Sequence, residues 1–479
     1  MAPTSPDPDG LPSPPEKDAS PVVGFDAGAA SHQGYREALE HLYGRLDLER
    51  VDPSKMKLTV ERDIQRFREL LHDLGDPHLA RPVIHATGTK GKGSTLAHLD
   101  AILNATGYHT GMTLSPHLVE VRERIRIGGE DLSRNDFARL YSEIRPVIEE
   151  RDQIKNYRTV FEVLIALAFH AFRHYHVDAA LVEIGLGGRL DATNVVYPKL
   201  SILTRIGLDH THVLGDTHAK IAWDKAHIIK PDTPVVTGPQ VPEAMREIEK
   251  RAHEVSSPIW RMGREAKLED VSVAEEGTSF TLVTPLREWT NLRTPLLGRH
   301  QAENAAVAVL AAERLQMDRH YHFSEEKLRL GLKQVRIPGR GELLNGEPPL
   351  LLDGAHNPEG ARVLAQLLRD VWPDREKVYL LGCNKDKDVA GFIGLMPGPV
   401  KAAVATTVDF PRAMPSPALA QIMRNQGWSV HEAPLDNALE TARNLAGPAG
   451  LIVASGSLYL VGALRRQILQ AGDGDTTLS

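Results

Sequence analysis

The stretch GTKGKGST, residues 88–95, joins a short apolar run, RPVIHA (81–86), to a segment with helical character, LAHLDAILNATG (96–107). Three glycines allow the backbone to curl at this strand-to-helix turn. The turn can then present N–H groups to an anion, and the start of the helix adds the positive end of its dipole. The turn is therefore a candidate phosphate site, in which Lys92 would reach the β- and γ-phosphates of a nucleotide and Ser94 or Thr95 could bind Mg²⁺.

The same turn has a second interpretation as a glycine-rich surface turn without a ligand. The common phosphate-loop pattern has a glycine where Ala86 stands, and a hydroxyl residue where Gly93 stands. Ser94 or Thr95 supplies a hydroxyl only one or two residues later. The turn by itself therefore leaves both interpretations open.

Composition limits the class of protein. Apolar residues make up 42% and charged residues 25% of the 479 residues, as in an ordinary globular chain. The net charge of −7 argues against a nucleic-acid-binding surface. The apolar run VLIALAF (163–169) is too short to span a membrane. The single cysteine, Cys383, excludes an intramolecular disulfide and suits a reducing cytoplasm. We expect a cytoplasmic monomer that binds small molecules, without nucleic acid or membrane partners.

The order of strand-like and helix-like segments predicts an α/β protein of two domains. Residues 1–34 are rich in Pro, Asp, Ser and Gly and are interpreted as a disordered tail. Residues 35–297 predict a P-loop-type ATP-binding domain with a mainly parallel sheet, to which 268–296 add a small antiparallel unit. Residues 298–479 predict a smaller Rossmann-like α/β domain with five strands after Leu350.

Two further motifs of the first domain combine polar residues with strand ends. Ser115, in SPHLVEVRERIRI, can bind a metal or can cap a turn. Glu183, in VEIGLGGRLDATN, stands inside an apolar strand, where an unpaired carboxylate is costly. Its partner is therefore a metal ion, or else Lys92 or Arg189 in a structural ion pair.

A cluster of potential ligands follows the next strand, in GLDHTHVLGDTHAKIAWDKAHI (207–228). Asp209, His210 and His212 offer carboxylate and imidazole groups, which are acceptable ligands for a divalent ion. The chain has 21 histidines, so a chance cluster is the alternative. Lys225, in a helical stretch beside Asp224, is on composition alone a solvated helix lysine.

Polar residues near the predicted domain junction and beyond it can line a cleft between the domains. Asn304, Arg340, Asp353 and His356 occur in GRHQAENAA, PGRGE and LDGAHNPEGA. They can hold an adenine, a ribose or a phosphate. Each also has a plain structural alternative, such as a helix cap or a strand-end turn.

Taken together and in this order, the motifs resemble those of folylpolyglutamate synthase and dihydrofolate synthase in the Mur ligase superfamily. The resemblance covers residues from about 35 to about 467, and GLGGRLDATN with DGAHNP is its most specific part. It implies an ATP- and Mg²⁺-dependent ligase that joins L-glutamate to dihydropteroate or a reduced folate through an acyl phosphate.

The resemblance also implies roles for individual residues. The implied ATP-binding residues are Gly88, Thr89, Lys90, Gly91, Lys92, Gly93, Ser94, Asn304, Arg340 and Asp353. The implied Mg²⁺ ligands are Ser115, Glu183 and His210. The implied substrate-binding residues are Leu190, Asp191, Ala192 and His356. Lys92, His210 and Lys225 are the implied catalytic residues, and Lys225 matches a lysine that is carbamylated in the family.

Other functions remain as alternatives. Another Mur-type amide ligase, such as one acting on a peptidoglycan precursor, would be expected to carry an added N-terminal domain. A folylpolyglutamate synthase with a single activity is a second possibility. A nucleotide-binding regulatory module without turnover is a third, and the joint presence of Lys92, Ser115, Glu183 and His210 argues against it.

Overall fold

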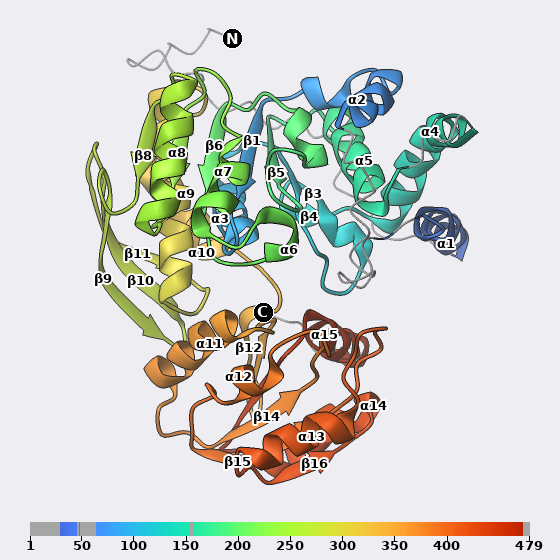
Figure 1. Ribbon diagram of the computed structural model, residues 1–479, viewed down its shortest axis with the longest axis vertical. Coiled ribbons are helices and arrows are strands. Elements are labelled where there is room, and N and C mark those ends of the chain that lie inside the picture. The colour runs from blue at the N-terminus through green and yellow to red at the C-terminus, as the bar shows by residue number, and fades with distance from the viewer. Residues whose placement is uncertain (1–28, 46, 48–63, 154–157, 473–479) are drawn as a thin grey trace, which may run out of the picture.

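Two α/β bodies make up the protein (Figure 1). The computed structural model describes residues 29–45, 47, 64–153 and 158–472. The larger body is built on an eight-stranded sheet of order β4-β3-β2-β5-β1-β6-β7-β8. Its strands are β1 (Val83–Thr87), β2 (Thr110–Thr113), β3 (Ile125–Ile127), β4 (Glu130–Asp131), β5 (Ala179–Glu183), β6 (Leu200–Leu203), β7 (Val235–Thr237) and β8 (Ile259–Arg261).

Six neighbouring strands of this sheet, from β2 to β8, run parallel, and β3 and β4 add an antiparallel edge. The central strands β1 and β5 are buried along their whole length, as expected when helices cover both faces. The covering helices are α1 (Ala29–Tyr43), α2 (Ile64–Asp73), α3 (Lys92–Thr106), α4 (Arg134–Gln153), α5 (Val160–His174), α6 (Thr211–Leu214), α7 (His218–Ala226), α8 (Pro242–Glu254), α9 (Arg299–Met317) and α10 (Glu325–Gln334). Among the described residues, the short 3₁₀ helices are η2 (Pro77–Leu79), η3 (Val121–Arg124) and η4 (Ala192–Val195).

A separate antiparallel sheet lies beside α9 and α10 at the left of Figure 1. It has the order β11-β10-β9 and consists of β9 (Lys267–Ala274), β10 (Gly277–Val283) and β11 (Glu288–Thr294). The prediction of a small antiparallel unit over 268–296 is therefore confirmed.

The smaller body is a six-stranded sheet of order β12-β13-β17-β14-β15-β16, with helices on both faces. Five strands are parallel, as the Rossmann-like prediction requires, and β12 adds an antiparallel edge that the sequence did not reveal. Its elements are β12 (Arg340–Leu344), β13 (Leu350–Asp353), α11 (Pro358–Val371), β14 (Lys377–Leu381), α12 (Val389–Ile393), β15 (Val400–Ala405), α13 (Ser416–Asn425), β16 (Val430–Glu432), α14 (Leu435–Ala446), β17 (Leu451–Ser455) and α15 (Leu458–Gly472).

Two predicted boundaries differ from this arrangement. The first 28 residues of the predicted tail lie outside the described residues, but Ala29–Gly34 belongs to α1. The boundary expected after Leu297 is also displaced, because α9 and α10 pack on α3 in the larger body. The sheet of the smaller body begins only at β12. Helix α9 is apolar around most of its circumference, so its sequence pattern does not show which sheet it covers.

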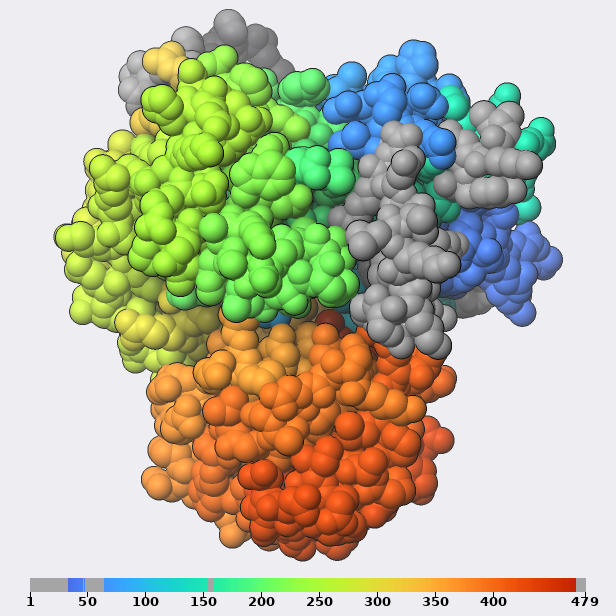
Figure 2. All heavy atoms as spheres, in the orientation of Figure 1, coloured from blue at the N-terminus to red at the C-terminus, as the bar shows by residue number. Residues whose placement is uncertain are grey.

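Among the described residues, no helix is long and apolar enough to cross a membrane. In the space-filling view a furrow separates the larger body from the smaller one, which is orange to red (Figure 2). The carboxyl ends of β1 and β5 carry the motifs that are described next, and β12 and β13 contribute residues from the other side.

The packing of α10 on α3 gives a test of the fold. A Cβ atom on Gly331 would lie 2.5 Å from Ile102 Cα and 2.6 Å from Ala101 O. Because helix backbone cannot yield as a side chain does, we expect Gly331→Ala to lower the free energy of unfolding by about 2 kcal/mol in urea denaturation. Gly34→Ala is the matched control, since its Cβ would meet Ala138 Cβ at an ordinary 3.6 Å. An undiminished stability of Gly331→Ala would contradict this packing.

Candidate active site

The turn between β1 and α3 is held on both sides by close contacts. A Cβ atom on Gly88 would lie 1.9 Å from Thr204 Oγ1, and one on Gly91 would lie 2.3 Å from Asn304 Oδ1. Both glycines also have positive φ angles, of 150° and 88°. Only glycine fits these two positions without displacing a neighbour. The turn is therefore a constrained structure and not a loose surface loop.

Some backbone groups of the turn already have partners. The N–H groups of Thr89 and Lys90 both donate to Arg205 O, at 2.9 and 3.3 Å. Thr89 Oγ1 donates to Gly207 O at 3.1 Å and accepts from Gly207 N at 3.0 Å. Of the predicted phosphate ligands, Thr89 and Lys90 thus use their amides to fix the turn. The N–H groups of the first turn of α3, which has Gly91 as its N-cap, remain as anion donors.

Lys92, the first residue of α3, faces the carboxylate of Glu183. Its Nζ lies 3.7 Å from Glu183 Oε1, and Glu183 Oε2 accepts from Ser115 N at 2.9 Å. These residues meet because β5, which ends at Glu183, lies between β1 and β2. Burial raises the pKa of Glu183, and Lys92 opposes that effect. The structural ion pair considered for Glu183 is present with Lys92, whereas Arg189 lies near Asp224, with 3.8 Å between Nε and Oδ2.

Lys225 is buried, with 4% of its surface exposed, so the interpretation as a solvated helix lysine is wrong. Helix α7 approaches the glycine-rich loop closely: a Cβ on Gly188 would lie 2.8 Å from Lys225 Cα. Lys225 Nζ donates to Gly88 O at 3.0 Å. Burial, together with the nearby charge of Lys92, lowers the pKa of Lys225 to about 7. A large part of this amine is therefore neutral near pH 7.

His210 and Asp209 stand beside the same turn. Asp209 Oδ2 lies 3.4 Å from Lys90 Nζ, and Asp209 Oδ1 accepts from His210 N at 2.9 Å. The side chain of His210 is 53% exposed, but partial desolvation by its surroundings lowers its pKa. The charges of Lys225 and Lys92 lower this pKa further, whereas Asp209 raises it. His210 is thus a neutral imidazole near the two lysines, which is the form that binds a metal.

The residues implied in substrate binding next to Arg189 have mixed environments. Asp191 is buried, and both of its oxygens serve the loop. Oδ2 accepts from Leu186 N at 2.9 Å, and Oδ1 accepts from Thr193 N at 3.0 Å and from Thr193 Oγ1 at 2.6 Å. Ala192 is also buried, while Leu190 is half-buried. Asp191 therefore acts first as an internal brace of the loop.

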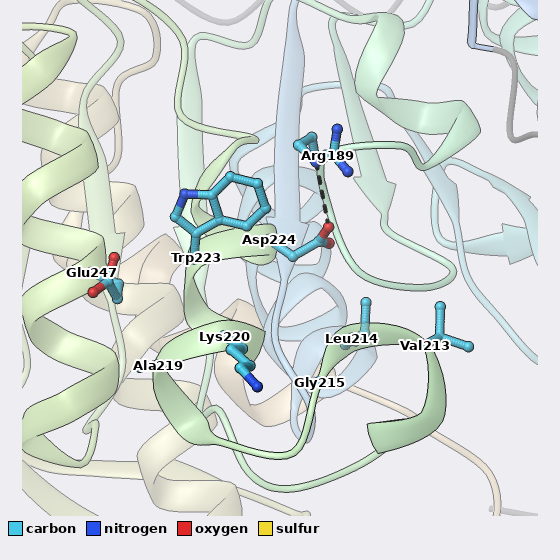
Figure 3. A pocket seen from close by; sticks show the side chains of 9 residues that line it. All are labelled: Arg189, Val213, Leu214, Gly215, Ala219, Lys220, Trp223, Asp224 and Glu247. Carbon is cyan, nitrogen blue, oxygen red and sulfur yellow. Dashed lines mark ion pairs between the residues drawn. The ribbon is translucent and has the colours of Figure 1, made fainter.

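A pocket of about 470 Å³ lies on the outer side of this loop, between α6, α7 and α8 (Figure 3). Arg189 reaches over the ring of Trp223, at 5.3 Å from its centroid, and lies near Asp224. Arg189 is the only residue of the Gly185–Ala192 stretch that lines this pocket. The pocket therefore does not coincide with the three residues implied in acceptor binding.

The other side of the site comes from α9 and from the smaller body. Asn304 contacts the turn at Gly91, and Arg340 pairs with Asp353 in the β12–β13 register. Asp353 accepts from the N–H groups of Gly341 and Ala355, both at 2.9 Å, and burial raises its pKa. The side chains of Asn304 and Arg340 can thus contact a ligand. Both carboxylate oxygens of Asp353, in contrast, already accept hydrogen bonds from backbone N–H groups.

His356 follows β13 and is a neutral acceptor. Its Nδ1 donates to Gly354 O at 2.9 Å, which leaves Nε2 as the acceptor. Burial lowers the pKa of His356 to about 4, and the charges of Lys90, Lys387 and Arg340 contribute. Lys90 belongs to the larger body and Lys387 to the smaller one, so the two bodies surround His356 with positive charge.

Sequence reasoning missed Lys387 and Glu359. Lys387 also acts on the pKa values of Asp209 and His210 in the larger body. Glu359, at the start of α11, lies against Gly207, whose Cβ would be 3.0 Å from Glu359 Oε1. The charged run NKDKD (384–388), separated by two residues from the end of β14, was an available signal for Lys387, because ligands of open parallel sheets bind at the carboxyl ends of strands.

The metal assignment has a partial donor set. Among the described residues, no group of three His, Cys, Asp or Glu side chains could hold a metal by itself. Mg²⁺, however, is commonly held by one or two carboxylates together with phosphate oxygens and waters. A buried carboxylate on Glu183 with the hydroxyl of Ser115 and the neutral imidazole of His210 fits that chemistry.

Comparison with known proteins agrees with this architecture. The model of the Mur ligase middle domain matches residues 86–312, and that of the Mur ligase glutamate ligase domain matches residues 339–458. A dihydrofolate synthase/folylpolyglutamate synthase of Bacillus subtilis is 34% identical over 91% of this chain and 99% of its own length. The dihydrofolate synthase/folylpolyglutamate synthase of Mycobacterium tuberculosis is also 34% identical, over 80% of this chain and 80% of its own length.

Solved structures agree as well. A Mycobacterium tuberculosis folylpolyglutamate synthase complexed with ADP matches with a TM-score of 0.82 and 32% identity over 91% of this chain and 98% of that one. An FPGS–AMPPCP–folate complex matches with a TM-score of 0.74 and 29% identity, over 91% and 99% of the two chains. Fold and site together define a ligase of the Mur type. Within that class, the chain belongs to the folylpolyglutamate synthase/dihydrofolate synthase family.

The buried pair of Lys92 and Glu183 can be tested through stability. Removing one partner leaves the other buried and uncompensated, so we expect Lys92→Ala to cost about 3 kcal/mol in unfolding free energy. The double variant Lys92→Ala/Glu183→Gln should cost at least about 1 kcal/mol less than the sum of the single variants. A double-mutant cycle in urea measures this coupling.

The exposed pair Lys220–Asp216, at 2.9 Å, is the control for this cycle. The costs of its two substitutions should be additive, because water screens both charges. Strictly additive costs for Lys92 and Glu183 would show that the two side chains do not form a pair.

Proposed function

We propose that this protein joins L-glutamate to a pterin-bearing acid, either dihydropteroate or a reduced folate, with ATP converted to ADP and phosphate. The carrying observation is the constrained turn after β1, where Lys92 and the first N–H groups of α3 lie beside Glu183 and the charge of Arg340 from the smaller body reaches the same carboxylate. Membership of the family and the relatives' names support the substrate class.

The proposed reaction has two steps. The terminal phosphoryl group of ATP passes to the acceptor carboxylate, which becomes an acyl phosphate. The amine of glutamate then attacks the acyl carbon, and the tetrahedral intermediate collapses to the amide and releases phosphate. The protein contributes mainly position and charge, as in other phosphoryl transfers.

The residues of the turn and the cleft divide these tasks. Lys92 and the first N–H groups of α3 neutralise the charge that develops on the phosphoryl oxygens. Asn304 and Arg340 hold the nucleotide across the cleft, with Asp353 shaping the backbone of β12 near it. His356 is a neutral imidazole, and its Nε2 accepts a hydrogen bond from an N–H of the incoming glutamate. This hydrogen bond helps to orient the amine.

Ser115, Glu183 and His210 would hold Mg²⁺. The ion supplies charge neutralisation for the ATP phosphates when it is bound. With the ion bound, Glu183 would have a second cationic partner besides Lys92, which would favour its ionised form despite its burial. The cleft residues Lys90, Arg340 and Lys387 add positive charge for anionic substrates.

The acceptor range is tested with purified protein, ATP, Mg²⁺ and glutamate. Each acceptor, dihydropteroate or tetrahydrofolate, is offered separately, and the glutamylated product and released phosphate are measured. We expect product from both, because the two acceptors share the pterin and present a carboxylate to the same phosphate. Product from tetrahydrofolate alone would show a folylpolyglutamate synthase with one activity.

Variants connect this activity to the turn. Lys92→Ala should lose at least about 100-fold in turnover with either acceptor, because its charge acts on the transferring phosphoryl group. Lys220→Ala, an exposed lysine of α7, should keep full activity. Near-normal turnover of Lys92→Ala would remove the turn from the proposed mechanism.

Lys225 is proposed to be carbamylated. CO₂ adds only to a neutral amine, and the pKa of Lys225 of about 7 provides that form. At constant dissolved CO₂, the carbamate should therefore increase as the pH rises from about 6 to about 8, in step with deprotonation of the amine. The measurement is the ¹³C NMR signal of protein kept under labelled CO₂.

The matched variants decide which lysine carries the signal. Lys225→Met should lose it, and Lys220→Ala should keep it. A signal that is absent at every pH, or that persists in Lys225→Met, would contradict the proposed modification.

A further inference from the structure

A second pocket, of about 350 Å³, shares no lining residue with the candidate active site. It opens between the β10–β11 turn, the end of α9 and the segment that leads into α10, at the side of the larger body where Figure 1 shows β10 and β11. Its lining combines apolar, acidic and basic side chains: Leu286, Arg287, Trp289, Glu313, Gln316, Met317, Arg319, Phe323 and Leu328.

Glu313 is the unusual member of this lining. It is 5% exposed, and its Oε1 accepts from Trp289 Nε1 at 2.7 Å. Arg287 Nε lies 3.9 Å from the same oxygen. Glu313 Oε2 is buried and accepts no hydrogen bond of ordinary geometry from the described residues. Burial raises the pKa of Glu313, and the nearby Thr284 side chain lowers it against that effect. A buried carboxylate oxygen without a donor is costly, so the site is suited to a ligand that brings an N–H group.

The walls and the mouth of the pocket restrict the ligand further. Phe323 and Leu328 form buried apolar walls, whereas Leu286 and Met317 at the mouth are 50% and 46% exposed. Both arginines of the lining, Arg287 and Arg319, are exposed as well. The unbranched side chain of Met317 can change rotamer as a ligand enters. A flat, partly apolar ring suits this space.

The charges of the pocket are arranged in two layers. The buried carboxylate of Glu313 attracts hydrogen-bond donors, while Arg287 and Arg319 at the surface repel cations and attract anions. The guanidinium groups of Arg287 and Arg329 already lie over the Trp289 ring, at 4.9 and 5.9 Å from its centroid. The complementary ligand has a neutral head with N–H donors and an anionic substituent.

We propose that this pocket binds a 2-amino-4-oxopyrimidine ring with an anionic substituent, the group that pterin acids and guanine nucleotides share. One edge of that ring carries two adjacent N–H donors, which match a carboxylate. The ring would lie between the apolar walls with those donors toward Glu313. Its carboxylate or phosphate would lie at Arg287 and Arg319.

Calorimetric titration of the full-length protein tests the proposal with two probes, pterin-6-carboxylate and GMP. Binding to this pocket should weaken at least about tenfold in Glu313→Gln, because the amide places a donor where the ring needs an acceptor. Met317→Trp should weaken it similarly by filling the mouth. Met317 is exposed, so this variant decides the matter if Glu313→Gln does not fold.

Leu330→Trp is the matched control, since Leu330 is also exposed, lies on α10 and does not line the pocket. It should leave binding of both probes unchanged. AMP should bind at least about tenfold more weakly than GMP, because adenine has a ring acceptor beside its single amine.

The outcomes separate the two sources of the ring. Binding of GMP alone assigns the pocket to nucleotides, and binding of the pterin alone assigns it to pterin acids. The candidate active site can also take up a nucleotide or a pterin acid, so the number of binding sites is compared between variants. An unchanged number of sites and unchanged affinities in both Glu313→Gln and Met317→Trp would overturn the proposal, as would equal binding of AMP to this pocket or no binding of either probe to it.

Discussion

The close clearance around the turn between β1 and α3 is the constraint on which the rest of the site depends. Gly88 is pressed against Thr204 at the end of β6, and Gly91 against Asn304 of α9. The turn is thereby fixed between the sheet and a helix that comes more than 200 residues later. The carbonyl of Gly88 then receives hydrogen bonds from two lysines, Lys92 at 3.3 Å and Lys225 at 3.0 Å.

Two ammonium groups that bind the same carbonyl repel each other, and the fold reduces this repulsion in two ways. Glu183, at the end of β5, balances the charge of Lys92. For Lys225, burial and the neighbouring Lys92 lower the pKa to about 7, so that the second charge is easily lost. The same arrangement that is tolerable without a ligand is complementary to polyphosphate, because an added anion relieves the remaining repulsion.

The candidate site draws residues from both bodies. The charge of Lys387 lowers the pKa values of Asp209, His210 and His356, although Asp209 and His210 belong to the larger body and His356 to the smaller one. Contacts outside the cleft hold the bodies together: Arg466 Nη2 donates to Val119 O at 3.0 Å, and Arg375 Nη1 lies 3.6 Å from Glu275 Oε1. A ligase that must bring three substrates to one phosphate benefits from this division, since each body can hold a different one.

Local sequence determined much of the fold. Apolar strands followed by helical segments predicted both parallel sheets, and the EEG turn predicted the β9–β10–β11 unit, because each of these signals depends on near neighbours in the chain. The motifs also identified Lys92, Glu183, His210 and Lys225 as candidates. What they could not decide was the environment of each side chain.

Tertiary structure decided those environments. Only the adjacency of β1 and β5 brings Lys92 to Glu183, and only the packing of α7 on Gly188 buries Lys225, which on composition alone was a solvated lysine. The placement of α9 with the larger body and the approach of Lys387 to the cleft likewise depend on contacts between distant segments. Sequence patterns report which face of a segment is apolar. They do not report which partner covers that face, because that choice is made by the free energy of the whole packed chain.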